Sequence, residues 1–194
     1  GSMSMLGLLK TPSIAQRFSG IHKSTITINN FPLPQEFPEV KRQSLKSNRI
    51  CYVGGITYER GISHVLDALV LNPELALDLC GPFEKESYKK ELIRHKGWQQ
   101  VKYHGVVDRK KMGEILAKCF CGIVTFLPYP NHIEAVPNKM FEYMASGLPV
   151  IASHFELWKH FVLDHGVGLC VDPEKPQSIA QAFLKLRQNP NLVD

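Results

Sequence analysis

The chain has 194 residues, of which 44% are hydrophobic and 21% charged, with a formal net charge of +5. This length fits one or at most two domains, and this composition excludes a disordered chain. No apolar run approaches the ~20 residues that span a bilayer. Lys and Arg are spread along the chain without the aromatic-interleaved basic stripe of nucleic-acid-binding proteins. We therefore expect a globular protein without membrane-spanning segments and without a nucleic-acid partner.

The first quarter of the chain differs from the rest. Residues 1–5 are expected to be a vector-derived tag. Within residues 6–48, the sequence predicts one helix over Ser13–Gly20 and one strand over Thr25–Ile28. A lone helix and strand ahead of a complete α/β domain indicate the trailing segment of an amino-terminal domain and a linker. We expect the domain itself over residues 49–194.

From residue 49 onward, apolar strands alternate with amphipathic helices. The runs that predict strands are Arg49–Val53, Leu75–Cys80, Val101–Tyr103, Cys121–Phe126, Pro149–Ala152 and Gly168–Val171. Four helices are marked by apolar faces: Ile62, Val65, Leu66 and Leu69; Met112, Ile115 and Leu116; Met140, Phe141, Met144 and Ala145; Ile179, Phe183 and Leu186. This alternation predicts an α/β, Rossmann-like doubly wound parallel sheet of about six strands.

Several residues predict where the helices begin and end. Asp108 is a candidate N-cap, and Pro137 and Pro176 suit the first turns of the helices that follow them. Gly147, just before Pro149, is expected to end the third of the marked helices.

The commonest strand order of such a sheet, 3-2-1-4-5-6, places the ends of strands 1 and 4 side by side. Ligands of open α/β sheets bind there, beyond the carboxyl ends of the strands. The loops Gly54–Gly61 and Leu127–Lys139 follow these two strands. They are therefore the candidate site.

The first loop suits a diphosphate. Gly54 and Gly55 let a ligand approach the backbone, because no β-carbon intervenes. Arg60 adds a forked cation just before a helix start, where free N–H groups favour anions. The alternative is a tight turn with a solvated arginine. The loop is neither GxGxxG nor a P-loop, which disfavours dehydrogenases and excludes P-loop nucleotidases.

The second loop leads into a helix that begins near Pro137, so Asn138 and Lys139 lie at its amino end. Glu142 lies about one turn further in, and Glu134 stands in the loop before it. The two carboxylates could accept hydrogen bonds from sugar hydroxyls, one at each end of a nucleotide sugar. The alternative is that Glu142 is a surface carboxylate favoured by the helix dipole.

No metal site is expected. Cys119 and Cys121 form a CxC pair without the second pair that zinc requires, and the five cysteines are better explained as reduced thiols of a cytoplasmic protein. The sequence His132-x-Glu134 is similar to the HxE of zinc deaminases, but their PCxxC is missing.

The second loop and its helix carry a resemblance to a known family. Glu134 and Glu142 are separated by seven residues and followed by YMASGLPVIAS over 143–153. This pattern resembles the carboxyl-terminal domain of family-four retaining glycosyltransferases, which have the GT-B fold of two Rossmann-like domains. The amino-acid sequence of residues 137–145 is typical of bacterial members that build capsule, O-antigen or exopolysaccharide. The Gly54–Gly61 loop also resembles the family's first loop.

The resemblance implies a role for each matching residue. Arg60 would neutralise the donor pyrophosphate, Glu134 would face the donor sugar as the catalytic carboxylate, and Glu142 would hold the ribose hydroxyls. The remaining donor contacts would come from Gly54, Gly55, Gly105, Val106, Val136, Asn138 and Lys139.

The chain departs from the family at two positions. Many members carry a second arginine where this chain has Gly55, and Lys139 is our candidate for the missing cation. Pro137 also lacks the N–H that Gly-rich members place near the sugar.

The expected function is that of a donor-binding domain moving a sugar from a nucleotide diphosphate sugar to a glycan or lipid-linked acceptor, with retention. No metal or other cofactor is implied. The acceptor would bind through a missing amino-terminal domain, so this chain alone is expected to bind donor but transfer poorly. We expect a cytoplasmic protein, with peripheral association at the inner membrane face. The alternatives are a GT-B-fold sugar-nucleotide epimerase or phosphorylase, and a non-catalytic α/β interaction module that binds no nucleotide.

Overall fold

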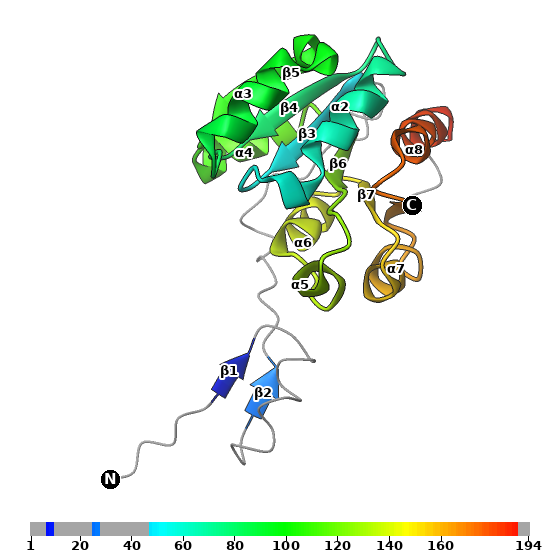
Figure 1. The fold of residues 1–194 in the computed structure, drawn as a ribbon. Helices are drawn as coiled ribbons and strands as arrows, with labels where there is room; N and C mark the ends of the chain where they lie inside the picture. The colour runs from blue at the N-terminus through cyan, green and yellow to red at the C-terminus, as the bar shows by residue number, and fades with distance from the viewer. Residues whose placement is uncertain (1–6, 10–24, 28–46, 190–194) are drawn as a thin grey trace.

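The structure is a computed structural model, and it describes residues 7–9, 25–27 and 47–189 (Figure 1). The first two strands, β1 (Gly7–Leu9) and β2 (Thr25–Thr27), pair in parallel and form a sheet of their own. β2 confirms the strand expected from Thr25, one residue shorter. The expected helix at Ser13–Gly20 and the expected tag at residues 1–5 lie outside the described residues.

Six parallel strands form the main sheet in the order β5-β4-β3-β6-β7-β8, which is the predicted order (Figure 1). Their bounds are β3 Arg49–Val53, β4 Ala76–Cys80, β5 Val101–Gly105, β6 Cys121–Val124, β7 Val150–Ser153 and β8 Gly168–Val171. The predicted Rossmann-like doubly wound sheet is therefore confirmed. Four of the strands differ from prediction by one or two residues at an end. At β4 and β6 the reason is that apolar residues stay buried outside the ladder, as Leu75 does before β4 and Phe126 does after β6.

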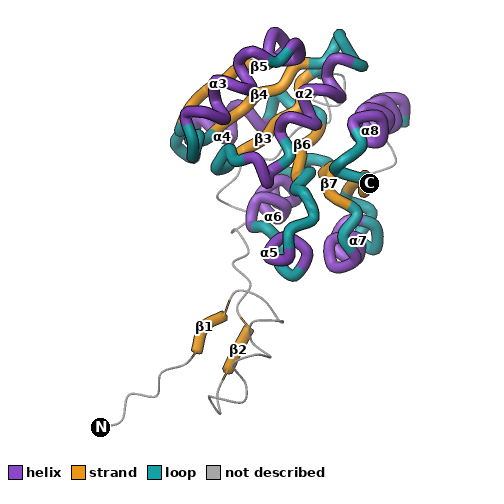
Figure 2. The backbone as a smooth tube through the Cα atoms, viewed as in Figure 1, coloured by secondary structure: helices purple, strands orange, loops and turns teal. Residues whose placement is uncertain are grey.

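Helices surround the sheet (Figure 2). They are α2 Ile62–Val70, α3 Glu86–Arg94, α4 Arg109–Leu116, α5 Pro130–Ile133, α6 Asn138–Ala145, α7 Glu156–Val162 and α8 Pro176–Gln188, with 3₁₀ turns η3 Tyr58–Arg60 and η4 Lys96–Gln100. α2 packs against α8, and α6 packs against β6 and β7. The apolar pattern does not predict α5 and α7, and both lie beside the site described below. None of the helices in the described ranges is long and apolar enough to cross a membrane.

The predicted helix ends are present. Asp108 caps α4, because its carboxylate accepts a hydrogen bond from Lys111 N at 2.7 Å. α6 begins at Asn138, with Pro137 as its N-cap residue, and α8 begins at Pro176. Gly147 has φ 67° just after α6 and so ends that helix in the left-handed conformation.

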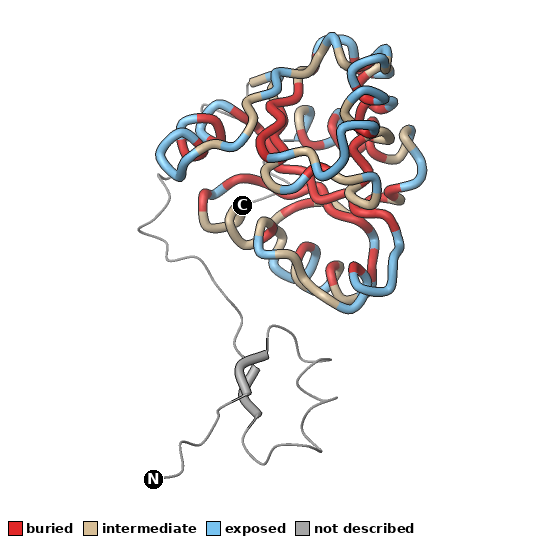
Figure 3. Tube along the Cα trace, turned by 60° about the vertical axis from the view of Figure 1, so that its left-hand side comes forward, coloured by how far each residue is buried: buried red, intermediate tan, exposed pale blue. Residues whose placement is uncertain are grey.

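The predicted apolar faces of α2, α4 and α8 are buried in the core, around the strands that Figure 3 shows as buried. The predicted face of α6 is partly wrong: Met140 is fully buried, whereas Phe141, Met144 and Ala145 are only partly buried. Tyr143 is the other fully buried residue of this helix. A tyrosine can be buried here because its hydroxyl finds a partner, Val53 N, at 2.9 Å.

One charged cluster lies inside the sheet. Asp78 on β4 is 3% exposed, and both of its oxygens accept hydrogen bonds from the Arg49 guanidinium at 2.6 Å. His104 Nε2 lies 2.6 Å from the same carboxylate. These bonds and charges outweigh burial and lower the pKa of Asp78. All five cysteines are free thiols, and four of them are buried, so the expectation of reduced thiols agrees with the packing.

Candidate functional site

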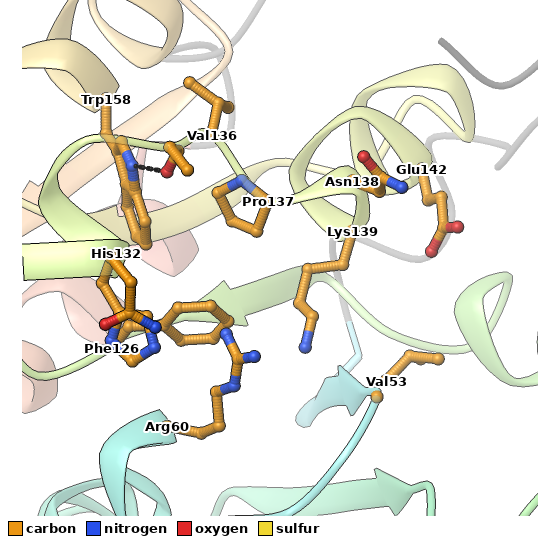
Figure 4. A pocket seen from close by; sticks show the side chains of 13 residues that line it. Val53, Arg60, Phe126, His132, Val136, Pro137, Asn138, Lys139, Glu142 and Trp158 are labelled. Atoms are coloured by element: carbon orange, nitrogen blue, oxygen red, sulfur yellow. Dashed lines mark hydrogen bonds between the residues drawn. The ribbon is translucent and has the colours of Figure 1, made fainter. Parts of the chain in front are cut away.

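A pocket of about 490 Å³ opens beyond the carboxyl ends of β3 and β6, where the strand order changes direction (Figure 4). Its volume is in the range of small-molecule sites. The lining comes from both predicted loops, α6 and α7: Val53, Gly54, Arg60, Phe126, Asn131, His132, Ala135, Val136, Pro137, Asn138, Lys139, Glu142 and Trp158. The pocket therefore lies at the switch point that the sequence indicates.

Two basic side chains in this pocket lie near the same aromatic ring, that of Phe126. Arg60 Cζ lies 4.1 Å from the Phe126 ring centroid, and Lys139 Nζ lies 4.9 Å from it. Lys139 Nζ also lies 4.3 Å from the Tyr52 ring centroid. Figure 4 shows the guanidinium and the ammonium pointing into the same space. Within residues 47–189 neither cation forms a salt bridge, although the Glu142 carboxylate lines the same pocket and acts on the charge of Lys139.

Arg60 is positioned by contacts between the two loops. It ends the 3₁₀ turn η3, and Gly61 follows with φ 72°. A β-carbon at Gly61 would collide with the Thr125 carbonyl after β6, so the close approach of the two loops requires glycine here. Leu127 N donates a hydrogen bond to Glu59 O at 2.9 Å and ties the loops together.

Lys139 is positioned by Tyr52 and Gly54. Its Nζ donates a hydrogen bond to Tyr52 Oη at 3.0 Å, and Tyr52 Oη in turn donates to Gly55 O at 2.7 Å. Gly54 has φ 136°, and a β-carbon there would collide with Lys139 Nζ. The chain of hydrogen bonds therefore connects α6 to the end of β3 and holds the ammonium beside the backbone of the first loop.

The electrostatics of the pocket favour an anion. Burial and, to a smaller extent, the charge of Arg60 lower the pKa of Lys139 to about 7, against the opposing effect of Glu142. Burial raises the pKa of Glu142, against the effect of Lys139 and Arg109. A bound anion would supply the negative charge that Lys139 and Arg60 lack, and α6 directs its first free N–H groups toward the same region.

The remaining wall is aromatic. Trp158 from α7 donates a hydrogen bond from Nε1 to Ala135 O at 2.8 Å, which fixes the segment between α5 and α6. Its ring packs edge-on against Phe126, with centroids 5.5 Å apart. His132 from α5 packs against the same Phe126 ring at 4.9 Å. These contacts give the pocket a rigid apolar side opposite its polar mouth.

The structure brings together six of the residues that the sequence singled out: Gly54, Arg60, Val136, Asn138, Lys139 and Glu142. The other four do not line this pocket. Gly55 and Glu134 are exposed, Val106 is 76% exposed, and Gly105 ends β5 with φ 67°. Glu134 follows α5 and directly precedes the lining residue Ala135.

Seven lining residues are not among the predicted site residues, and three of them are large ring side chains: Phe126, His132 and Trp158. Phe126 belongs to a predicted strand, and the only sequence pattern that includes His132 is the HxE pair that it forms with Glu134. Trp158 carries no local signal, because α7 itself was not predicted. Among the described residues no group of three or more His, Cys, Asp or Glu side chains is placed to hold a metal ion.

The parallel sheet with a cationic pocket at its switch point defines a Rossmann-like ligand-binding domain. The chain belongs to the family glycosyl transferases group 1, whose family model matches residues 35–194. A comparison with curated proteins finds no match.

Solved glycosyltransferase structures share the fold. Sucrose-phosphate synthase from Thermosynechococcus elongatus is 19% identical with a TM-score of 0.76, over 96% of this chain and 50% of that one. Anabaena HepE, solved with UDP-glucose, is 19% identical with a TM-score of 0.77, over 97% and 55%. WaaG, a glycosyltransferase involved in lipopolysaccharide biosynthesis, is 14% identical with a TM-score of 0.72, over 95% and 54%. This chain thus spans about half the length of these proteins, and it matches one Rossmann-like half of the GT-B architecture.

Proposed function

We propose that this chain is the donor-binding domain of a retaining glycosyltransferase, and that its pocket holds a nucleoside diphosphate sugar. The observation that carries the proposal is the pair of basic side chains, Arg60 and Lys139, which face one space at the amino end of α6 and form no salt bridge within residues 47–189. A diphosphate satisfies both charges and the helix start together. Solved neighbours in complex with UDP, with UDP-glucose, and with UDP and GlcNAc support this ligand class.

Each proposed contact has a place along the donor. The diphosphate lies between Arg60 and Lys139, close to the backbone of Gly54 and Asn138. Glu142 accepts hydrogen bonds from the ribose hydroxyls. The main chain of Gly105 and Val106 contacts the base, and Gly55 and Val136 complete the phosphate surroundings. The arrangement of the two cations assigns to Lys139 the charge that many relatives place at the position of Gly55.

In the transfer step the bond between the anomeric carbon and the β-phosphate oxygen breaks. Negative charge then grows on the leaving diphosphate, where the two cations stabilise it without a metal ion. The acceptor hydroxyl forms the new bond on the same face of the sugar, and its proton passes to the leaving β-phosphate oxygen. Glu134 steadies the positive charge of the oxocarbenium-like sugar. The acceptor is a glycan or lipid-linked sugar held by an amino-terminal domain, of which residues 6–48 are the trailing segment.

The proposed setting is surface polysaccharide biosynthesis in the cytoplasm, with peripheral association at the inner membrane face. The amino-acid sequence of residues 137–145 and the structural similarity to WaaG support this setting. The chain alone is proposed to bind donor but to transfer poorly, because the acceptor side of the cleft belongs to the other domain.

Isothermal titration of the chain with UDP, GDP and ADP tests the proposal. We expect one diphosphate to bind, and Arg60→Ala or Lys139→Ala to weaken it about 10–100-fold, as for loss of a charge-assisted hydrogen bond. Lys185→Ala is the matched control, because Lys185 is exposed on α8 and does not line the pocket. Binding of none of the three, or binding indifferent to Arg60, would contradict the proposal.

A further inference from the structure

His132 is a buried polar side chain in the pocket wall to which the proposed function gives no role. It is 6% exposed and lies on the short helix α5. Its ring packs against Phe126 at 4.9 Å and edge-on against Tyr129 at 5.9 Å between centroids. The ring is therefore held in one orientation by neighbours on two sides.

The hydrogen bond of His132 determines which nitrogen carries the proton. Nδ1 lies 3.0 Å from Leu127 O. A carbonyl oxygen only accepts, so Nδ1 must be the donor. In the neutral ring, Nε2 is then a bare acceptor with its lone pair in the ring plane.

Nε2 of His132 has no hydrogen-bond partner in the described part of the chain. The buried side-chain polar atoms that lack a partner there are His64 Nδ1, Tyr88 Oη and Thr125 Oγ1. His132 Nε2 also makes no hydrogen bond among residues 47–189. Unlike these three atoms, however, it is not closed off from solvent. Because His132 lines the pocket, solvent or a ligand reaches Nε2 from the pocket.

The surroundings keep the ring neutral. Burial lowers the pKa of His132, and the Leu127 carbonyl opposes this shift. The charges of Arg60 and Lys139 lower the pKa further, whereas Glu59 raises it. At neutral pH the pocket therefore contains a hydrogen-bond acceptor without charge.

His132 lies at the end of the pocket where one part of the proposed donor would bind. In Figure 4, Glu142 lies on one side of the Arg60–Lys139 pair, and His132 lies on the other side, next to Phe126 and Trp158. With the ribose at Glu142 and the diphosphate between the cations, the group beyond the β-phosphate extends toward His132. That group is the sugar to be transferred.

We propose that His132 determines donor specificity by accepting, through Nε2, a hydrogen bond from a hydroxyl group of the transferred sugar. This inference rests on the proposed function, and it names the substrate class more closely: a donor whose sugar is neutral and bears a hydroxyl at this end of the pocket. A carboxylate there would meet the Nε2 lone pair and have no proton to donate, so uronic acid conjugates are disfavoured.

The first test separates sugar contacts from diphosphate contacts. Affinities are measured for the tightest-binding of UDP, GDP and ADP, and for its conjugates with glucose, galactose, mannose, N-acetylglucosamine and glucuronic acid. We expect one neutral conjugate to bind more tightly than the bare diphosphate. His132→Phe should weaken that conjugate about 5–30-fold, as for loss of one hydrogen bond, and leave the diphosphate unchanged. His132→Gln, whose side-chain oxygen can accept at a similar place, should restore much of the loss.

His160→Phe is the matched control, because His160 is exposed on α7 and lies 3.0 Å from Asp164, outside the pocket.

A second readout uses the unaltered chain and so does not depend on how a variant folds. In long-range proton–nitrogen NMR spectra, the Nε2 signal of His132 should differ between the complex with the sugar conjugate and the complex with the bare diphosphate, because only the conjugate donates a hydrogen bond to Nε2.

The outcomes are distinct. If no diphosphate binds, the proposed function fails, and this inference fails with it. If a diphosphate binds through Arg60, the proposed function stands, and the inference alone is overturned by any of three results. These are equal effects of His132→Phe on diphosphate and conjugate, no neutral conjugate that exceeds the diphosphate in affinity, or an Nε2 signal that is the same in both complexes.

Discussion

Lys139 Nζ occupies the space that a β-carbon on residue 54 would need, and Gly54 adopts φ 136° beside it. The two residues are far apart in sequence, at the end of β3 and the start of α6. The absence of a side chain at residue 54 is therefore what allows the lysine to reach the hydroxyl of Tyr52 and the neighbourhood of Arg60.

Gly54→Ala is expected to damage binding and stability together. The new methyl group displaces the ammonium and strains a backbone conformation that only glycine adopts readily, at a cost of about 1–3 kcal/mol in free energy of unfolding. Diphosphate affinity should fall by about tenfold or more. Gly166→Ala is the control, because Gly166 also has a positive φ, 61°, no atom lies within 4 Å of a β-carbon there, and it does not line the pocket. Equal effects of the two substitutions would show that Lys139 is not held as described.

Lys139→Met is expected to stabilise the free protein while weakening donor binding. Burial lowers the pKa of Lys139 from its usual 10.5 to about 7. Between these values the unfolded chain binds more protons than the native protein, so the wild-type free energy of unfolding rises with pH there. At pH 7 the substitution should add about 2–4 kcal/mol, and at pH 10 the gain should nearly vanish. Urea unfolding at both pH values measures this, and a gain independent of pH would contradict it.

Donor affinity is expected to fall as the pH rises above about 7. A bound diphosphate favours the charged form of Lys139, so binding takes up a proton wherever the free lysine is neutral. The affinity for a nucleotide sugar should decrease by up to tenfold per pH unit until the pKa of the complex is reached. Calorimetric titrations between pH 6 and 9 test this. Lys139→Arg should remove the slope, because arginine stays charged throughout; an unchanged slope would assign the proton to another group.

Tyr143→Phe is expected to lower the free energy of unfolding by removing a hydrogen bond at the end of β3, beside the pocket. The hydroxyl of this buried tyrosine accepts the hydrogen bond of Val53 N, the last residue of β3. Removing it leaves a partly buried N–H without its protein partner, which costs up to about 1–3 kcal/mol. Tyr103→Phe is the comparison, since that hydroxyl donates to Gly81 O from a side chain that is 37% exposed. Thermal unfolding of the two variants should show the larger loss for Tyr143.

Much of the fold could be predicted because its signals are local. The alternation of β-branched runs with segments of helical spacing predicted the order of the elements along the chain. The strand order was then predicted as the commonest one for doubly wound sheets. Helix starts at Asp108, Pro137 and Pro176 depend on the capping residue alone. The face of α6 was partly wrong because burial of Tyr143 depends on a donor from another strand, which no local pattern reveals.

The sequence by itself determined the sheet, the switch point and the two loops that meet there, including Arg60, Lys139 and Glu142. Only the tertiary structure decided that the two cations share Phe126, that Trp158 closes the wall, and that His132 presents an unprotonated nitrogen to the pocket. It also placed Glu134, Gly55 and Val106 outside the lining. The physical reason is that side-chain contacts between separate elements depend on packing distances of a few ångströms, whereas periodicity and capping depend only on neighbours along the chain.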